Sequence, residues 1–178
     1  MKVLKTPRLI LRKMETKDAP ELFAYASDPE VSRYVSWETH RSLEDSLWFI
    51  NFTLQRYATE GIGGFGIIYK ETNQFIGTCG YEFWNKEHHS AEIGYALSRT
   101  YWGKGLMPEA IAKLLLFGFE EMGLNRIQAR VELENTRSQR VVEKLGMRFE
   151  GVLREVMWVK GSYRDLKLYS ILKREYAP

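Results

Sequence analysis

The chain has 178 residues, of which 44% are hydrophobic and 28% charged, a composition that fits one folded domain and excludes long disorder. A formal net charge of +3 without a basic tract argues against a nucleic-acid partner. The single cysteine, Cys79, excludes an internal disulfide and a metal site built on thiolates. The sequence has no signal-peptide pattern and no apolar run of membrane-spanning length, so we expect a cytoplasmic protein without a membrane partner.

The first sixty residues alternate between strand and helix patterns. Residues 9–12 are typical of a strand. Thr16 is predicted to cap a helix that ends at about Ser27. Residues 33–40 are irregular and rich in aromatics, and a long amphipathic helix is predicted from Ser42 to Glu60.

The rest of the chain predicts a mixed α/β sheet within a single domain, residues 1–178. Apolar residues at every second position indicate strands, and apolar residues three to four positions apart indicate helices. Strands are expected at 65–70, 74–83, 90–97 and 126–133, helices at about 106–122 and 136–145, and a closing hairpin at 152–160 and 163–172 around Gly161-Ser162.

A glycine-rich segment, 61–66, matches the pattern G-x-G-x-x-G of dinucleotide-binding folds. That mechanism needs a strand before the glycines and a helix after them. Here the predicted order is reversed, so we interpret the segment as a helix-to-strand loop that borders a substrate cleft, and we do not expect NAD binding.

A second glycine turn, Gly103-Lys104-Gly105, leads directly into the most apolar predicted helix. The first amides of a helix are unpaired and sit at its positive dipole end. Glycines before them let the backbone approach a phosphate closely. The turn therefore predicts a site for a phosphorylated cofactor, although the same pattern also fits an ordinary turn.

The segment 135–147 supports the first of these interpretations. Thr136 and Gln139 fit a capping box at the start of a short helix. Ser138 lies one turn before two valines and is expected to point inward. A basic stripe formed by Arg137, Arg140 and Lys144 lies beside it, and is compatible with a solvated face or with phosphate contacts.

Together these motifs resemble the GNAT acetyltransferase superfamily over essentially the whole chain. Within it the sequence is most similar to the RimJ/RimL-type branch, named for N-acetyltransferases of ribosomal-protein N-termini. The shared features are Thr6–Arg12, Ala91–Tyr95, the Gly-Lys-Gly turn, the Asn135-x-x-Ser138 motif and Leu145-Gly146-Met147. The resemblance implies a central, mostly antiparallel sheet of about seven strands, splayed between the fourth and fifth, with about four flanking helices.

The resemblance also implies acetyl-CoA as cosubstrate, with no metal. The residues expected to bind it are Tyr95, Ala96, Leu97, Trp102, Gly103, Lys104, Gly105, Leu106, Met107, Asn135, Ser138, Arg140 and Lys144. The turn ends in Trp102 and Met107 where the superfamily usually has Gln or Arg and a small residue. Because backbone amides carry the phosphate contacts, these departures leave coenzyme A binding in place.

Catalytic residues are harder to carry over. Many family members place a tyrosine seven residues after the asparagine to protonate the departing thiolate, and that position is Val142 here. Ser138 is the replacement that the branch suggests. A backbone N–H near Gly94 or Tyr95 would steady the oxyanion. Glu92 is the first candidate for the general base and Glu82 the second; alternatively, Glu92 only pairs with a nearby arginine.

The acceptor is expected to be an amine, either a peptide or protein N-terminus or a small molecule. The resemblance places Tyr34 and Trp37 over the acceptor site, while local packing is the alternative. His88 and His89 are expected in an exposed turn. The chain is expected to be a monomer or homodimer, and an idle acyl-CoA sensor stays open as a different class of function.

Overall fold

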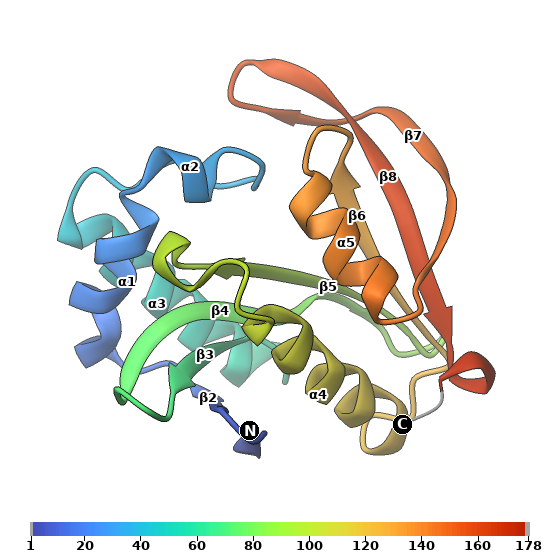
Figure 1. Ribbon diagram of the computed structural model, residues 1–178, viewed down its shortest axis with the longest axis horizontal. Coiled ribbons are helices and arrows are strands. Elements are labelled where there is room, and N and C mark those ends of the chain that lie inside the picture. The colour runs from blue at the N-terminus through green and yellow to red at the C-terminus, as the bar shows by residue number, and fades with distance from the viewer. Residues whose placement is uncertain (1, 177–178) are drawn as a thin grey trace.

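The computed structural model describes residues 2–176 and contains one open sheet (Figure 1). Its eight strands lie in the order β1-β2-β3-β4-β5-β6-β8-β7. The strands are β1 (Leu4–Lys5), β2 (Leu9–Lys13), β3 (Gly64–Tyr69), β4 (Gln74–Asn85), β5 (Ser90–Leu97), β6 (Arg126–Glu132), β7 (Arg148–Val159) and β8 (Ser162–Leu172). The α-helices are α1 (Ala19–Ala26), α2 (Pro29–Ser32), α3 (Leu43–Thr59), α4 (Leu106–Glu120) and α5 (Thr136–Lys144).

This arrangement confirms the mixed, mostly antiparallel fold. The eighth strand is the two-residue β1, and the fifth helix is the four-residue α2, both too short to leave a periodic signal. Three short 3₁₀ turns at Thr16–Asp18, Arg99–Tyr101 and Lys173–Glu175 complete the elements.

The sheet opens at its one parallel pair. β5 and β6 pair only through Ser90↔Arg126, Ala91↔Ile127 and Glu92↔Gln128, and then diverge (Figure 1). β5 stays paired with β4 as far as Leu97. The peptide groups of β5 beyond Glu92 are therefore left without a strand on the β6 side, and among them the Leu97 carbonyl accepts from Trp102 Nε1 at 2.7 Å.

Separate cores cover the two faces of the sheet. Leu106, Ile111 and Leu114 of α4 belong to the larger core, together with inward-facing residues of β2 to β6 and Val142 of α5. Leu22 of α1 and Ile50 of α3 belong to the other. The alternation along β5 follows from this, because Ile93 and Leu97 join the first core while Ala96 joins the second.

Three local predictions are wrong. Thr16 does not cap α1: it lies in a 3₁₀ turn, and the helix starts at Ala19, where Pro20 presets the backbone angle. The closing hairpin turns at Lys160-Gly161, both at positive φ, so Ser162 is already the first residue of β8. The expected capping box of Thr136 and Gln139 is replaced by an Asn135 cap, as described below.

Candidate active site

Two cavities meet where β5 and β6 diverge. The first, of about 440 Å³, lies between the start of α4 and α5. The second, of about 400 Å³, lies between α3 and the strands β4 to β6. Six residues line both cavities: Tyr34, Val35, Tyr95, Ala96, Asn135 and Ser138. Groups bound in the two cavities would therefore meet beside the central part of β5.

The first cavity begins at the predicted glycine turn. Gly103 and Gly105 have φ angles of 75° and 72°, the left-handed region that favours glycine. In the described part of the chain, the five successive amides 103–107 donate to no backbone carbonyl. They precede or open the 15-residue helix α4. This turn offers unpaired N–H groups at a positive helix end, which is a good environment for phosphate oxygens.

A latch from the N-terminal segment holds the turn in place. Arg8 Nε lies 2.6 Å from Glu109 Oε2, and Arg8 Nη1 donates to the carbonyl of Lys104 at 2.9 Å. The Arg8 amide and the Thr6 hydroxyl both donate to Glu109 Oε1. Glu109 lies in the first turn of α4, where a carboxylate also interacts favourably with the helix dipole. The latch links the segment just before β2 to the backbone of the glycine turn.

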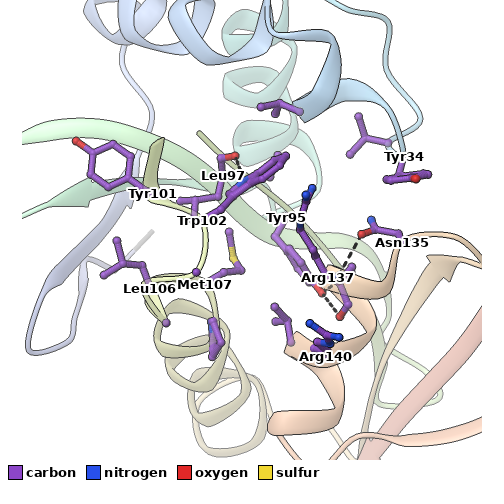
Figure 2. Close-up of a pocket in the computed structure, with 18 of the residues that line it drawn as sticks. Tyr34, Tyr95, Leu97, Tyr101, Trp102, Leu106, Met107, Asn135, Arg137 and Arg140 are labelled. Atoms are coloured by element: carbon purple, nitrogen blue, oxygen red, sulfur yellow. Dashed lines mark hydrogen bonds between the residues drawn. The ribbon is translucent and has the colours of Figure 1, made fainter. Parts of the chain in front are cut away.

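The first cavity gathers most residues that were expected to bind cofactor. All of those residues line it except Lys104, whose ammonium lies 5.0 Å from the centre of the Tyr101 ring. Figure 2 shows residues of the turn and α4 on one side, Arg137 and Arg140 of α5 on the other, and Tyr95 between. Arg137, assigned only to the basic stripe, packs over the Trp102 ring at 4.5 Å.

Asn135 fixes the start of α5 and the position of Ser138. Its side-chain oxygen accepts from the backbone N–H of Ser138 at 3.1 Å, and its own backbone N–H donates to the Glu132 carbonyl. Gln139 turns back instead, and donates from Nε2 to the carbonyls of Glu132 and Leu133. Both bonds tie α5 to the end of β6, so the helix start depends on the strand before it.

Ser138 forms a hydrogen bond with Tyr95 across the opening. The two hydroxyl oxygens are 2.7 Å apart, and both residues line both cavities. Burial raises the pKa of Tyr95 to about 12, partly offset by this bond. Val142, at the position of the family tyrosine, is fully buried in the core and lines neither cavity. The pairing of Tyr95 with Ser138 was not predicted from the sequence.

Glu92 lies in the wall of the second cavity as half of an ion pair. Its side chain is 11% exposed, and Oε1 is 2.7 Å from Arg130 Nε. Oε2 accepts from Gln128 Nε2 at 3.0 Å. The arginine pairing that the sequence left open as an alternative is thus present, and both carboxylate oxygens have partners on β6.

Glu82 is placed differently, because it is the extra residue of a β-bulge. Tyr81 pairs with Ile93 and Phe83 with Glu92, so Glu82 has no partner on β5. A Cβ on Gly94 would lie 2.6 Å from Glu82 Oε1, so glycine there leaves room for the carboxylate. The side chain is 62% exposed within the cavity, and Arg56 Nη1 is 3.9 Å away. Desolvation by the cavity walls raises the pKa of Glu82, with Arg56 opposing and Glu92 adding to the rise.

Aromatic side chains line the outer part of the second cavity. Tyr34 and Trp37 are both there, with Tyr34 reaching the first cavity as well. Trp37 also packs on His40, with ring centroids 5.4 Å apart. Trp48 and Phe52 of α3 line the same cavity, and neither was predicted from the sequence to do so.

The histidine pair, the single cysteine and the glycine-rich segment are placed differently from one another. His88 and His89 are exposed in the turn between β4 and β5, as expected, whereas Cys79 is a buried core residue that also lines the second cavity. Residues 61–63 of the glycine-rich segment lie in the helix-to-strand loop, as expected, whereas 64–66 already belong to β3, and Gly64 lines the second cavity. Within residues 2–176 no group of three or more His, Cys, Asp or Glu side chains is arranged to hold a metal ion. The same residues include no helix long and apolar enough to cross a membrane.

Residues 8–148 match the family model described as an acetyltransferase (GNAT) domain. The chain belongs to the GNAT acetyltransferase family. An uncharacterized N-acetyltransferase, p20 of Bacillus licheniformis, is 44% identical over 99% of both chains. These similarities make this GNAT protein an N-acetyltransferase, as the sequence motifs predicted.

Two further relatives concern the acceptor and the cofactor. The [ribosomal protein uS5]-alanine N-acetyltransferase of Escherichia coli is 25% identical, over 98% of this chain and 93% of its own. A solved structure of RimL, a ribosomal L7/L12 α-N-protein acetyltransferase in complex with coenzyme A, has a TM-score of 0.86 at 17% identity. The superposition covers 96% of this chain and 98% of RimL, and shows a shared fold.

Proposed function

We propose that this GNAT enzyme transfers acetyl from acetyl-CoA to the α-amino group of a peptide or protein N-terminus. The observation that carries the proposal is the junction of the two cavities at Tyr95 and Ser138. One cavity begins at unpaired helix amides, and the other contains Glu82 and Glu92. The names of the ribosomal-protein acetyltransferase relatives support the acceptor class.

The first cavity fits acetyl-CoA by the chemistry of its donors. The amides of residues 103–107 would hold the pyrophosphate, with Arg137, Arg140 and Lys144 supplying positive charge. The free side of β5 beyond Glu92 would hold the amides of the pantetheine arm. Bound there, acetyl-CoA supplies an acetyl thioester at the junction of the cavities. An N–H near Gly94 or Tyr95 would then donate to the thioester oxygen as negative charge develops on it.

Glu82 is better placed than Glu92 to take the proton of the attacking amine. Both oxygens of Glu92 are engaged by Arg130 and Gln128. Glu82 projects into the cavity from the bulge, with Arg56 Nη1 at 3.9 Å. An α-amino group has a pKa of about 7.7–8.0, so it is partly neutral at pH 7 and needs only a modest base. A carboxylate with a raised pKa keeps the proton more readily than an ordinary one.

Ser138 and Tyr95 supply the proton for the leaving thiolate. A serine hydroxyl is a much weaker acid than a phenol. Tyr95, with its pKa raised to about 12, is in turn a weaker acid than an alkyl thiol such as cysteine, at about 8.5, so the proton moves to sulfur only if Tyr95 is then reprotonated. If Ser138 gave up its proton alone, a serine alkoxide would remain. Because Tyr95 Oη lies 2.7 Å from Ser138 Oγ, it can pass its own proton to Ser138 as Ser138 protonates sulfur. The C–S bond breaks and the S–H bond forms. The proton taken from the amine leaves Glu82 for solvent, and a proton from solvent restores Tyr95.

Isothermal titration of acetyl-CoA into the purified protein tests the first half of the proposal. Gly105→Asp places a side chain and a negative charge at the turn, and should weaken acetyl-CoA binding at least tenfold. Gly161→Asp is the matched control, since Gly161 also has positive φ, at 75°, but lies in the β7–β8 turn away from both cavities. Equal affinity in both variants would overturn the placement of the pyrophosphate.

Release of coenzyme A thiol in the presence of peptides or of small amines tests the second half. Acetylation of peptide α-amino groups, located by mass spectrometry, is the expected result. Efficient turnover of small amines with no peptide product would move the acceptor class to small molecules. Binding of acetyl-CoA without transfer to any amine would indicate a sensor.

A further inference from the structure

The face of α3 that lines the second cavity carries two exposed aromatic rings. Trp48 and Phe52 are 67% and 46% exposed. Their rings are stacked, with centroids 5.4 Å apart and planes inclined by 5°. Single exposed apolar residues are common on protein surfaces, whereas a preformed stacked pair in the wall of a cavity offers a flat apolar contact for a ligand.

The pair continues into the polar end of the cavity along one helix face. Trp48, Phe52 and Arg56 are four residues apart in turn, so they lie one above the other. Arg56 Nη2 donates to the Glu82 carbonyl at 2.9 Å, which joins this face to the bulge. At a rise of 1.5 Å per residue, Phe52 lies about 6 Å and Trp48 about 12 Å along the helix from Arg56.

The charges of the cavity suit the cationic end of a peptide. The charged residues that line it are the acidic Glu82, Glu92 and Glu132 and the basic Arg56 and Arg130. Arg130 is paired with Glu92, and Arg164 lies 3.7 Å from Glu132. Arg56 lies 2.9 Å from Glu60, closer than its 3.9 Å approach to Glu82. Glu82 is thus the most available charge for an arriving α-ammonium group.

We propose that the acceptor is a peptide N-terminus with a large apolar or aromatic side chain within the two to three residues after the acetylated one, and that this side chain packs on Trp48 and Phe52. The inference rests on the proposed function. An extended peptide advances about 3.3–3.6 Å per residue. A chain that has its amine at Glu82, beside Arg56, and then runs along α3 covers the helix rise of about 6–12 Å from Arg56 to the two rings in that number of residues. The aromatic pair then selects acceptors by sequence.

The test uses hexapeptides that differ only by one phenylalanine at position two, three or four, with an all-alanine and an aspartate peptide for comparison. The best phenylalanine peptide should exceed the alanine peptide at least tenfold in kcat/KM, which corresponds to about 1.4 kcal/mol. Trp48→Ala and Phe52→Ala should bring this ratio close to one. Trp158→Ala is the matched control, because Trp158 is 63% exposed and paired with Tyr163 but lines neither cavity. That variant should keep the wild-type ratio.

The outcomes separate this inference from the proposed function. Acetylation of all peptides at similar kcat/KM would overturn the role of the aromatic pair and leave peptide acetylation standing. The role of the pair is equally overturned if Trp48→Ala, folded by circular dichroism, keeps the full phenylalanine preference. Turnover of small amines alone would overturn both. The wild-type peptide series can overturn the inference even where one variant fails to fold, and the other ring variant then tests the role of the pair.

Discussion

The hydrogen bond between Tyr95 and Ser138 gives a prediction with a defined size. Tyr95→Phe removes only the hydroxyl and leaves the ring packed beside the larger core. The lost bond should lower the free energy of unfolding by about 0.5–1.5 kcal/mol, so the variant should still fold. General acid catalysis contributes roughly 10²–10⁴-fold. We therefore expect kcat to fall at least about 10²-fold, equivalent to about 2.7 kcal/mol of transition-state stabilisation.

The double variant distinguishes a relay from two independent contributions. Residues that act as a unit lose function together, so Tyr95→Phe with Ser138→Ala should be no more than about threefold slower than the slower single variant. The affinity for acetyl-CoA should change less than threefold in all of them. Single-turnover release of coenzyme A thiol is the appropriate assay, because product release often limits kcat. A Tyr95→Phe variant within threefold of wild type would refute the relay and leave Ser138 acting alone.

Three further predictions test the base, the latch and the core. In the wild type, the plot of log(kcat/KM) against pH should steepen from slope one toward slope two below the raised pKa of Glu82, because both the amine and Glu82 must lose a proton. The Glu82→Gln variant should keep slope one at low pH. A variant profile identical to that of the wild type would exclude Glu82 as the base. Arg8→Ala should weaken acetyl-CoA binding about tenfold in calorimetry with little change in kcat. Lys2→Ala, which breaks an exposed ion pair, should have no effect on binding. Equal affinities in the two variants would show that the latch does not contribute to cofactor binding. Gly118→Ala should lower the free energy of unfolding, measured in urea, by about 1–2 kcal/mol, because the new Cβ would lie 2.5 Å from Tyr81 Oη. A variant as stable as the wild type would contradict this crowding.

The geometry of the first cavity could be predicted because its determinants are local in sequence. A turn with two positive-φ glycines before a helix produces unpaired amides whatever surrounds it. The strand that ends at Leu97 and the helix that follows Asn135 are equally visible in periodicity and capping residues. Even here the cap was misassigned by one residue. Asn135 and Thr136 are both good caps, and the hydrogen bond from the Asn135 amide to Glu132 at the end of β6 decides between them.

The contacts that position the proposed catalytic groups join residues far apart in the chain. Tyr95 and Ser138 are separated by 43 residues, and Arg8 and Glu109 by 101. Strand alternation also misses the placement of Glu82, since a bulge breaks the period of two and redirects the side chain. No pattern confined to a short stretch of sequence contains this information.

The same contrast explains why the acceptor is harder to predict than the cofactor. In the proposed phosphate site the donors are backbone amides, so side chains at Trp102 and Met107 can depart from the family pattern without removing these donors. The second cavity, the proposed acceptor site, is lined by residues from α3, α5, the strands β3 to β8 and the segment 34–37. A substitution on the outer face of α3 can therefore change which peptide binds while the glycine turn, the Arg8 latch and the Tyr95–Ser138 pair stay in place. Acceptor preference should thus depend on the identity of the rings at positions 48 and 52 more than on the motifs that define the family.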